Sequence, residues 1–210
     1  MASEQAPSKE GQIQRVFTIV RRQLAAMDCI LGDLLDIART ESGTLKLTLQ
    51  PTDVRQIILE SVELFEIASK NHRIEVIVPD FPLLVACDTL RLQQVLSNLL
   101  SNAIKYSPKG GSVAVRATRT PSEVWIEVAD TGIGLSPEQL AELFQPFRRL
   151  SEHAGIAGAG LGLSIVRRLI KAHGGQVEVS SERGSGSVFK VRIPRLPASK
   201  VDETVTARLH

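Results

Sequence analysis

The chain has 210 residues, of which 43% are hydrophobic, so it can bury a packed core and is not a disordered protein. Its 25 Lys and Arg residues nearly balance 23 Asp and Glu residues, and the net charge of +2 gives no broad field that would attract nucleic acid. No apolar run approaches the ~18 to 20 residues of a bilayer-spanning helix and no signal peptide is present, so we expect a cytoplasmic globular protein without a membrane span.

The segment 13–43 shows a heptad pattern and follows a polar stretch, 1–12, that we expect to be a loose N-terminus. Its apolar residues recur at alternating steps of three and four, as in the seam of a coiled coil or helical bundle, and they are Phe17, Val20, Leu24, Met27, Leu31, Leu34 and Ala38. Glycine favours the position after a helix C-terminus, so one long helix ending near Gly43 is predicted.

Residues 44–195 are expected to form one domain, followed by a loose tail at 196–210. Capping residues and apolar spacing predict three helices, at about 53–69, 88–106 and 161–173. Alternation of apolar and polar residues predicts strands at about 45–50, 73–78, 112–118, 123–129, 176–180 and 187–193. This mixed order, with hairpins rather than βαβ units, favours an α+β two-layer sandwich: a mixed, mostly antiparallel sheet with three helices on one face.

The helix predicted over 88–106 carries Asn98, Asn102 and Lys105 on one stripe, because they are spaced i, i+4 and i+7. Asparagine is a mediocre residue inside a helix, and a buried one must find hydrogen bonds or cost roughly 1 to 3 kcal/mol. A bound ion and its phosphates would supply those bonds. An ordinary solvated face is the alternative, and this helix alone favours neither.

The strand predicted over 123–129 places its apolar residues on one face, and the same period puts Asp130 on that face at the end of the strand. A carboxylate there can accept a hydrogen bond from a donor such as an exocyclic amine. Gly132 and Gly134 follow, and they permit close backbone approach and positive φ. Taken alone, this motif also fits a simple turn after a strand.

A glycine-rich segment from Gly158 to Leu163 opens directly into the last predicted helix. Free backbone N–H groups and the positive end of that helix are thus available to phosphates. The spacing fits neither GxGxxG after a strand nor the P-loop pattern GxxxxGK[ST]. Flexibility alone is the other reason for such glycines.

Together these segments resemble the ATP-binding domain of sensor histidine kinases, in the superfamily shared with gyrase B, Hsp90 and MutL. Five motifs of that domain occur in order over about 45–194: the N box at 96–107, the G1 box at 130–135, the F box at 144–149, the G2 box at 158–163 and the closing strand motif at 184–189. Ala159 stands where the G2 box more usually has Thr.

The resemblance implies a Bergerat-type sandwich that binds ATP with Mg²⁺. It implies that Asn102 ligates Mg²⁺ with Asn98 close by, that Lys105 and Tyr106 line the nucleotide site, and that Asp130 accepts from the adenine amino group. The segment 131–160 is the implied mobile lid.

The implied catalytic residues are Asn98, Lys105 and Arg149, of which Arg149 reaches the γ-phosphate from the lid. The further implied nucleotide-binding residues are Gly132, Gly134, Gly158, Gly160, Leu161, Gly162, Leu163 and Ser187.

Relatives that hydrolyse ATP carry a Glu four residues before the metal-binding Asn, where it activates water as a general base. Asn98 occupies that position here, which predicts slow hydrolysis and favours a kinase over a hydrolytic ATPase of the gyrase and Hsp90 type. A nucleotide-binding scaffold without transfer activity and an anti-sigma-factor-type Ser kinase are the remaining alternatives.

The N-terminal helix resembles the second helix of the family's dimerisation and phosphoacceptor hairpin. None of the four histidines, His72, His153, His173 and His210, lies in the family's phosphoacceptor context, and a structural cap is expected of His173. The resemblance thus implies an acceptor hairpin outside this chain, a response regulator as partner, and a chain that does not autophosphorylate. We expect a part of a larger sensor kinase, which can be membrane-bound, rather than a naturally incomplete protein. The unpaired heptad seam predicts a homodimer through residues 13–41.

Overall fold

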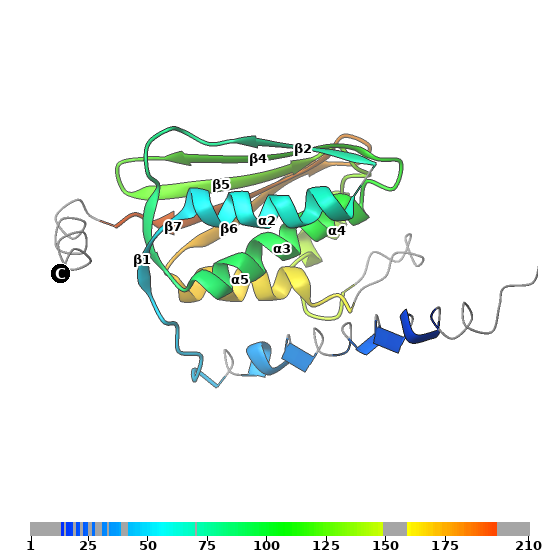
Figure 1. Cartoon of the computed structure of the whole chain (residues 1–210), viewed down its shortest axis with the longest axis horizontal. Helices are drawn as coiled ribbons and strands as arrows, with labels where there is room; N and C mark the ends of the chain where they lie inside the picture. Colours follow the sequence, from blue (N-terminus) through cyan, green and yellow to red (C-terminus); the bar gives the residue numbers. More distant parts are fainter. Residues whose placement is uncertain are drawn as a thin grey trace, which may run out of the picture.

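A five-stranded sheet with helices on one face forms the body of the molecule (Figure 1). The computed structural model describes residues 42–69, 71–148 and 159–196, and some of the positions between 14 and 38. The strands lie in the order β2-β4-β5-β7-β6, and each neighbouring pair is antiparallel except β2 and β4, which are parallel. Their bounds are β2 His72–Ile77, β4 Gly111–Arg119, β5 Glu123–Asp130, β6 Gln176–Glu182 and β7 Gly186–Pro194.

Three helices cover one face of this sheet (Figure 1): α2 Val54–Ala68, α3 Thr89–Lys105 and α5 Gly162–Ala172. The core lies between the two layers because each element has one apolar face. In β5, alternate residues are buried, and α3 turns its aliphatic residues inward: Leu92, Val95, Leu96, Leu99, Leu100 and Ala103. Burial of a large aliphatic side chain contributes about 1.5 to 3 kcal/mol relative to exposure, so this packing holds α3 and α5 firmly on the sheet. The predicted α+β sandwich is confirmed.

The other face of the sheet carries charged side chains beside an aromatic ring. Glu127 of β5 pairs with Lys190 of β7 at 2.8 Å, and the Lys190 ammonium lies 4.8 Å from the centre of the Trp125 ring. These side chains are partly exposed and satisfy one another.

The predicted strand at 45–50 is wrong. The strand β1, Gln50–Asp53, begins where the predicted strand ends, and it pairs with β3, Leu84–Cys87, in a separate two-stranded ladder. Pro51 lies inside β1, opposite Ala86, which is tolerated because a two-stranded ladder has only edge strands. Alternation of leucines at 45–49 therefore does not suffice for a strand, because these residues pair with no strand that the structure describes.

Two short elements were not predicted: β3, and the helix α4, Pro137–Glu142, which lies in the segment 131–160 implied to be a mobile lid. Ser136 caps α4 in a capping box with Gln139, so the helix start does have a sequence signal. At six residues it is too short to show apolar periodicity.

The described residues between 14 and 38 are helical, as predicted, and the end of this helix packs against the domain. Asp36 Oδ2 accepts a hydrogen bond from Arg91 Nη1 of α3 at 2.5 Å, and Arg168 Nη1 of α5 donates to Ile37 O at 3.2 Å.

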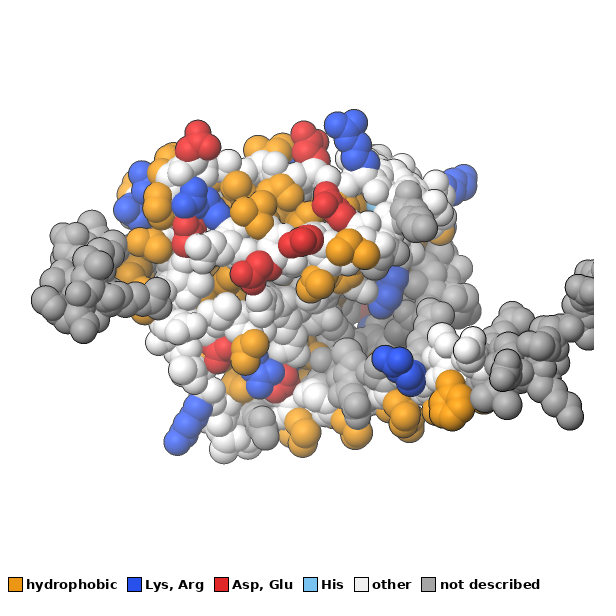
Figure 2. Space-filling view, viewed as in Figure 1, with side chains coloured by type: hydrophobic (Ala, Val, Ile, Leu, Met, Phe, Trp, Pro, Cys, Tyr) orange, Lys and Arg blue, Asp and Glu red, His pale blue; other side chains and the backbone are white. Residues whose placement is uncertain are grey.

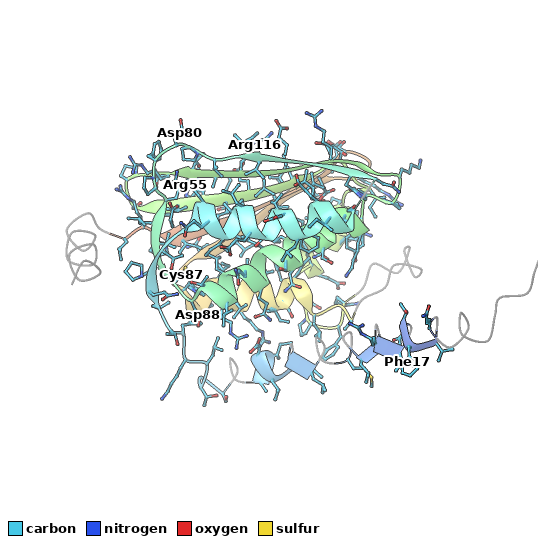
Figure 3. The ribbon with its side chains drawn as sticks, in the orientation of Figure 1. Phe17, Arg55, Asp80, Cys87, Asp88 and Arg116 are labelled. Carbon is cyan, nitrogen blue, oxygen red and sulfur yellow. The ribbon has the colours of Figure 1, made fainter. Side chains whose placement is uncertain are left out.

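Apolar side chains of the N-terminal helix are exposed along the edge of the molecule (Figure 2). They include Phe17, which Figure 3 labels and which is 66% exposed, together with Val20, Leu24, Met27, Leu31 and Leu34. In the part of the chain that the structure describes, no helix has the length and apolar character needed to cross a bilayer.

Candidate functional site

The helix α3 supplies the polar stripe of the candidate site. Asp88 caps the start of α3, because Asp88 Oδ1 accepts a hydrogen bond from the Arg91 N–H at 3.2 Å. Figure 3 labels Asp88 next to Cys87. Asn98 and Asn102 are half-buried, whereas Lys105 is exposed in the last turn. The structure therefore places the predicted stripe outside the apolar core, on the side of α3 that its leucines leave uncovered. Tyr106, the C-cap residue, is half-buried beside it.

The N-terminus of α5 lies against Asn98. Gly162 is the first residue of α5, and a Cβ at this position would lie 3.0 Å from Asn98 Oδ1. The N-cap residue, Leu161, has an apolar side chain and makes no capping hydrogen bond to the first N–H groups of α5. Asn98 Nδ2 is buried and has no hydrogen-bond partner among the described residues. Asn98 therefore turns Oδ1 toward the start of α5 and leaves Nδ2 unpaired among the described residues, while the first turn of α5 offers backbone N–H groups that favour an anion.

The residues of the G2 box differ in how deeply they are buried at the start of α5. The Leu161 side chain is buried and Leu163 packs partly buried against the core, so their side chains hold α5 in place while their backbone forms its first turn. Gly160 has φ +72, and a Cβ there would lie 2.7 Å from Arg148 O. Two of the predicted site residues, Arg149 and Gly158, lie outside the described residues.

Asp130 ends β5 on the buried face, as the period of the strand predicts, and it is 8% exposed. Its Oδ1 accepts a hydrogen bond from the Gly132 N–H at 2.9 Å. Burial raises the pKa of Asp130 above its ordinary value, and the backbone hydrogen bonds from Gly132 and Ser187 oppose this effect without cancelling it. The second carboxylate oxygen can still accept from a ligand.

Gly132 and Gly134 allow the chain after β5 to pack tightly. A Cβ on Gly132 would lie 2.2 Å from Tyr106 O, and one on Gly134, which has φ +63, would lie 1.9 Å from a backbone oxygen of β6. Between them, the Ile133 N–H donates to Tyr106 O at 3.0 Å, and Ile133 O accepts from the Gly184 N–H at 2.7 Å. The loop after Asp130 is therefore held between the end of α3 and the β6–β7 turn.

Ser187 joins the site from β7, where it is paired with Asp130 across the β5–β7 ladder. The residue is 8% exposed, and its Oγ lies 2.9 Å from Ser181 Oγ of β6. The closing strand motif thus stands next to the end of β5, although the two segments are far apart in the sequence.

Ser107 is the polar residue near the site that sequence reasoning missed as a functional candidate. It is 2% exposed, and its Oγ lies 2.7 Å from the position that a Cβ of Gly132 would occupy. The N box ends at Ser107, but nothing in the local pattern shows that a serine just past a helix end is buried.

The two described histidines have structural roles. His173 Nδ1 donates to Leu169 O at 2.7 Å, and its Nε2 accepts from the Asp88 N–H at 3.0 Å, so the predicted capping role is confirmed. His72 Nε2 donates to Ser107 O at 2.9 Å. His153 and His210 lie outside the described residues.

The arrangement fits an anionic ligand that also carries a hydrogen-bond donor. Asn98 Nδ2 is a donor without a partner among the described residues, the first turn of α5 offers backbone N–H groups, and Asp130 is a buried acceptor. Asn102, four residues from Asn98 on α3, offers an amide oxygen of the kind that Mg²⁺ accepts as a ligand.

Residues 87–197 match the family described as histidine kinase-, DNA gyrase B-, and HSP90-like ATPase. The adaptive-response sensory kinase SasA of Thermosynechococcus vestitus is 37% identical over 197 residues, which cover 92% of this chain and 51% of that protein. The chain therefore spans about half the length of this curated relative.

Two solved structures are also similar. A mycobacterial sensor histidine kinase, MprB, superposes with a TM-score of 0.63 at 30% identity, over 71% of this chain and 99% of that one. Full-length ShkA, solved in complex with AMPPNP, gives a TM-score of 0.76 at 31% identity, over 92% of this chain and 41% of that one.

Proposed function

Because the chain belongs to the histidine kinase-, DNA gyrase B-, and HSP90-like ATPase family and carries a histidine kinase catalytic domain, we propose that it transfers the γ-phosphate of Mg²⁺-bound ATP to a histidine outside this chain. The observation that supports this proposal most is the close approach of Asn98, whose Nδ2 has no partner among the described residues, to the start of α5 at Gly162.

Phosphoryl transfer depends mostly on positioning and on neutralising charge. The first N–H groups of α5 and Asn98 Nδ2 would hold phosphate oxygens, and Lys105, exposed in the last turn of α3, would add a positive charge. Asn102 would hold Mg²⁺ through its side-chain oxygen. When bound, Mg²⁺ would neutralise phosphate charge as it develops. Arg149 is proposed to approach the γ-phosphate.

Asp130 would orient the nucleotide from its base. Its carboxylate can accept from the adenine amino group, and Tyr106, Gly132, Gly134 and Ser187 surround that end of β5. The buried position of Asp130 strengthens such a hydrogen bond because water competes less for it.

Water is a poor acceptor in this proposal. The position four residues before Asn102 holds an amide, Asn98, which cannot act as the general base that hydrolytic relatives use. Both ring nitrogens of His72 and His173 are engaged in hydrogen bonds, which favours an acceptor histidine on a separate hairpin. A response regulator would receive the phosphate next.

The exposed apolar residues of the N-terminal helix support a homodimer through residues 13–41. Six large apolar side chains on one heptad stripe, from Phe17 to Leu34, would be buried if two copies paired there.

Calorimetric titration with ADP and a non-hydrolysable ATP analogue, with and without Mg²⁺, tests the nucleotide site. Labelled ATP mixed with the chain and a separately prepared phosphoacceptor hairpin tests the transfer. Mg²⁺-dependent binding with label on the hairpin histidine is the expected result. Binding without label would favour the scaffold alternative, and absence of binding would refute the proposal.

A further inference from the structure

Ser107 carries a buried hydroxyl that the described part of the chain leaves unsatisfied. The residue is 2% exposed, and its Oγ has no hydrogen-bond partner among the described residues. A buried hydroxyl without a partner destabilises a fold, and alanine, which is almost the same size, carries no such cost. An unpaired buried hydroxyl of this kind is typical of a side chain that binds a ligand.

The backbone holds this residue in one place. The Ser107 N–H donates to Ile104 O at 3.2 Å, and Ser107 O accepts from the Gly110 N–H and from His72 Nε2, both at 2.9 Å. The backbone of Ser107 is thus fixed, and its unpaired hydroxyl can move only by rotation of the side chain about the Cα–Cβ bond.

Ser107 and Asp130 flank the same point. Ser107 Oγ lies 2.7 Å, and Asp130 Oδ1 lies 2.8 Å, from the position that a Cβ of Gly132 would occupy. The hydroxyl and the carboxylate therefore lie no more than about 5.5 Å apart, close enough for both to contact one edge of a ligand.

We propose that Ser107 is a second base-reading residue: its hydroxyl donates a hydrogen bond to N1 of adenine, directly or through one water molecule, while Asp130 accepts from the 6-amino group. This assignment rests on the proposed ATP binding. An ionised carboxylate only accepts, so Asp130 alone cannot satisfy N1, which is itself an acceptor. The Gly132 N–H already donates to Asp130, whereas the Ser107 hydroxyl is unpaired among the described residues. A donor beside an acceptor matches the edge of adenine, and guanine would bring its O6 acceptor against the carboxylate.

Calorimetry with three diphosphates separates the two contacts in the wild type and in Ser107→Ala. The ligands are ADP, 1-deaza-ADP, in which CH replaces N1, and purine riboside diphosphate, which lacks the amino group. Ser107→Ala should weaken ADP and purine riboside diphosphate by about 3- to 10-fold and leave 1-deaza-ADP unchanged. Ser180→Ala, at an exposed serine of β6, is the matched control and should bind all three as the wild type does.

An equal loss for ADP and 1-deaza-ADP, or no loss for ADP, would overturn the role of Ser107 while leaving ATP binding in place. A wild type that binds none of the three diphosphates would overturn the proposed function and this inference with it.

Thermal unfolding supplies an independent readout. Without nucleotide, Ser107→Ala should have a Tm equal to or higher than that of the wild type, because an unpaired buried hydroxyl is removed. With ADP its rise in Tm should be smaller than that of the wild type. A lower Tm without nucleotide would show that the hydroxyl serves the fold, and the proposal would be wrong.

Discussion

Asp36 of the N-terminal helix and Arg91 of α3 form an ion pair across the junction between that helix and the domain. Their Oδ2 and Nη1 atoms lie 2.5 Å apart, and the side chains are 6% and 26% exposed, respectively. Gln94 Nε2 also donates to Asp36 Oδ2, at 3.1 Å. A buried carboxylate is costly unless it is paired, so these two donors of α3, the helix that also carries Asn98 and Asn102, help to hold the end of the N-terminal helix.

Replacement of Asp36 by Ala should loosen this junction. We expect faster backbone hydrogen exchange across 42–49 and a decrease of about 1 to 2 kcal/mol in the free energy of unfolding. This decrease is small for a charged hydrogen bond because Arg91 is partly exposed to solvent. Affinity for ADP should not change. Gln23→Ala, at an exposed position of the same helix, is the control and should exchange as the wild type does. Unchanged exchange in Asp36→Ala would show that Ile37 and the remaining contacts suffice.

Asn102→Ala should abolish the part of the nucleotide affinity that depends on Mg²⁺ and leave the fold intact. The side chain is only half-buried and lies outside the core, so its removal creates no large cavity. Titration with ADP in the presence and absence of Mg²⁺ measures the effect. Gln93→Ala, which removes only an exposed hydrogen bond between α3 and α2, controls for changes in α3. Retention of the Mg²⁺ dependence in Asn102→Ala would refute the metal role.

Gly134→Ala should be far more damaging than Gly184→Ala, although both glycines have positive φ. At Gly184 a Cβ would meet nothing within 4 Å, so only backbone strain of about 1 to 2 kcal/mol is expected. At Gly134 the Cβ would lie 1.9 Å from Glu182 O, which adds a steric cost of about 1 to 3 kcal/mol. Denaturant unfolding compares the two variants. Equal losses would mean that the loop after β5 can move away from β6.

Asp130→Asn should maintain or raise the stability of the fold but weaken the binding of nucleotide. Burial raises the pKa of Asp130, so ionisation of this carboxyl in the folded protein lowers the free energy of unfolding. In the wild type that free energy therefore decreases as pH rises from the ordinary pKa range of a carboxyl through the raised pKa of Asp130. The variant should therefore be at least as stable as the wild type at neutral pH, and this advantage should shrink on acidification. ADP affinity at neutral pH should fall by about 1.5 to 3 kcal/mol.

The pH dependence of binding checks the same assignment. Wild-type affinity for ADP should decrease as pH falls through the raised pKa of Asp130, and the difference between wild type and Asp130→Asn should decrease with it. Titration of the ligand phosphates is common to both proteins and cancels in that difference. A difference that does not vary with pH would show that the Asp130 charge does not contribute to base recognition.

Local sequence patterns predicted the elements that repeat over several turns or residue pairs. The period of two in β5 placed Asp130 on the buried face, and the spacing of Asn98 and Asn102 placed both on one side of α3. The strand expected at 45–50 failed because pairing requires a neighbour that the alternation of leucines does not reveal. The short helix α4 has a clear cap at Ser136 but too few residues for a periodic signal.

Spacing within single segments is enough to predict the α+β class, the buried faces of the helices and strands, and the motifs that resemble a kinase domain. Contacts between distant segments are visible only in the folded chain: Gly162 with Asn98, Ser187 with Asp130, and Asp36 with Arg91. The same holds for the Ser107 hydroxyl, which is buried without a partner in the described chain. Such relationships arise when distant segments pack, and packing is set by the whole apolar core rather than by any local pattern.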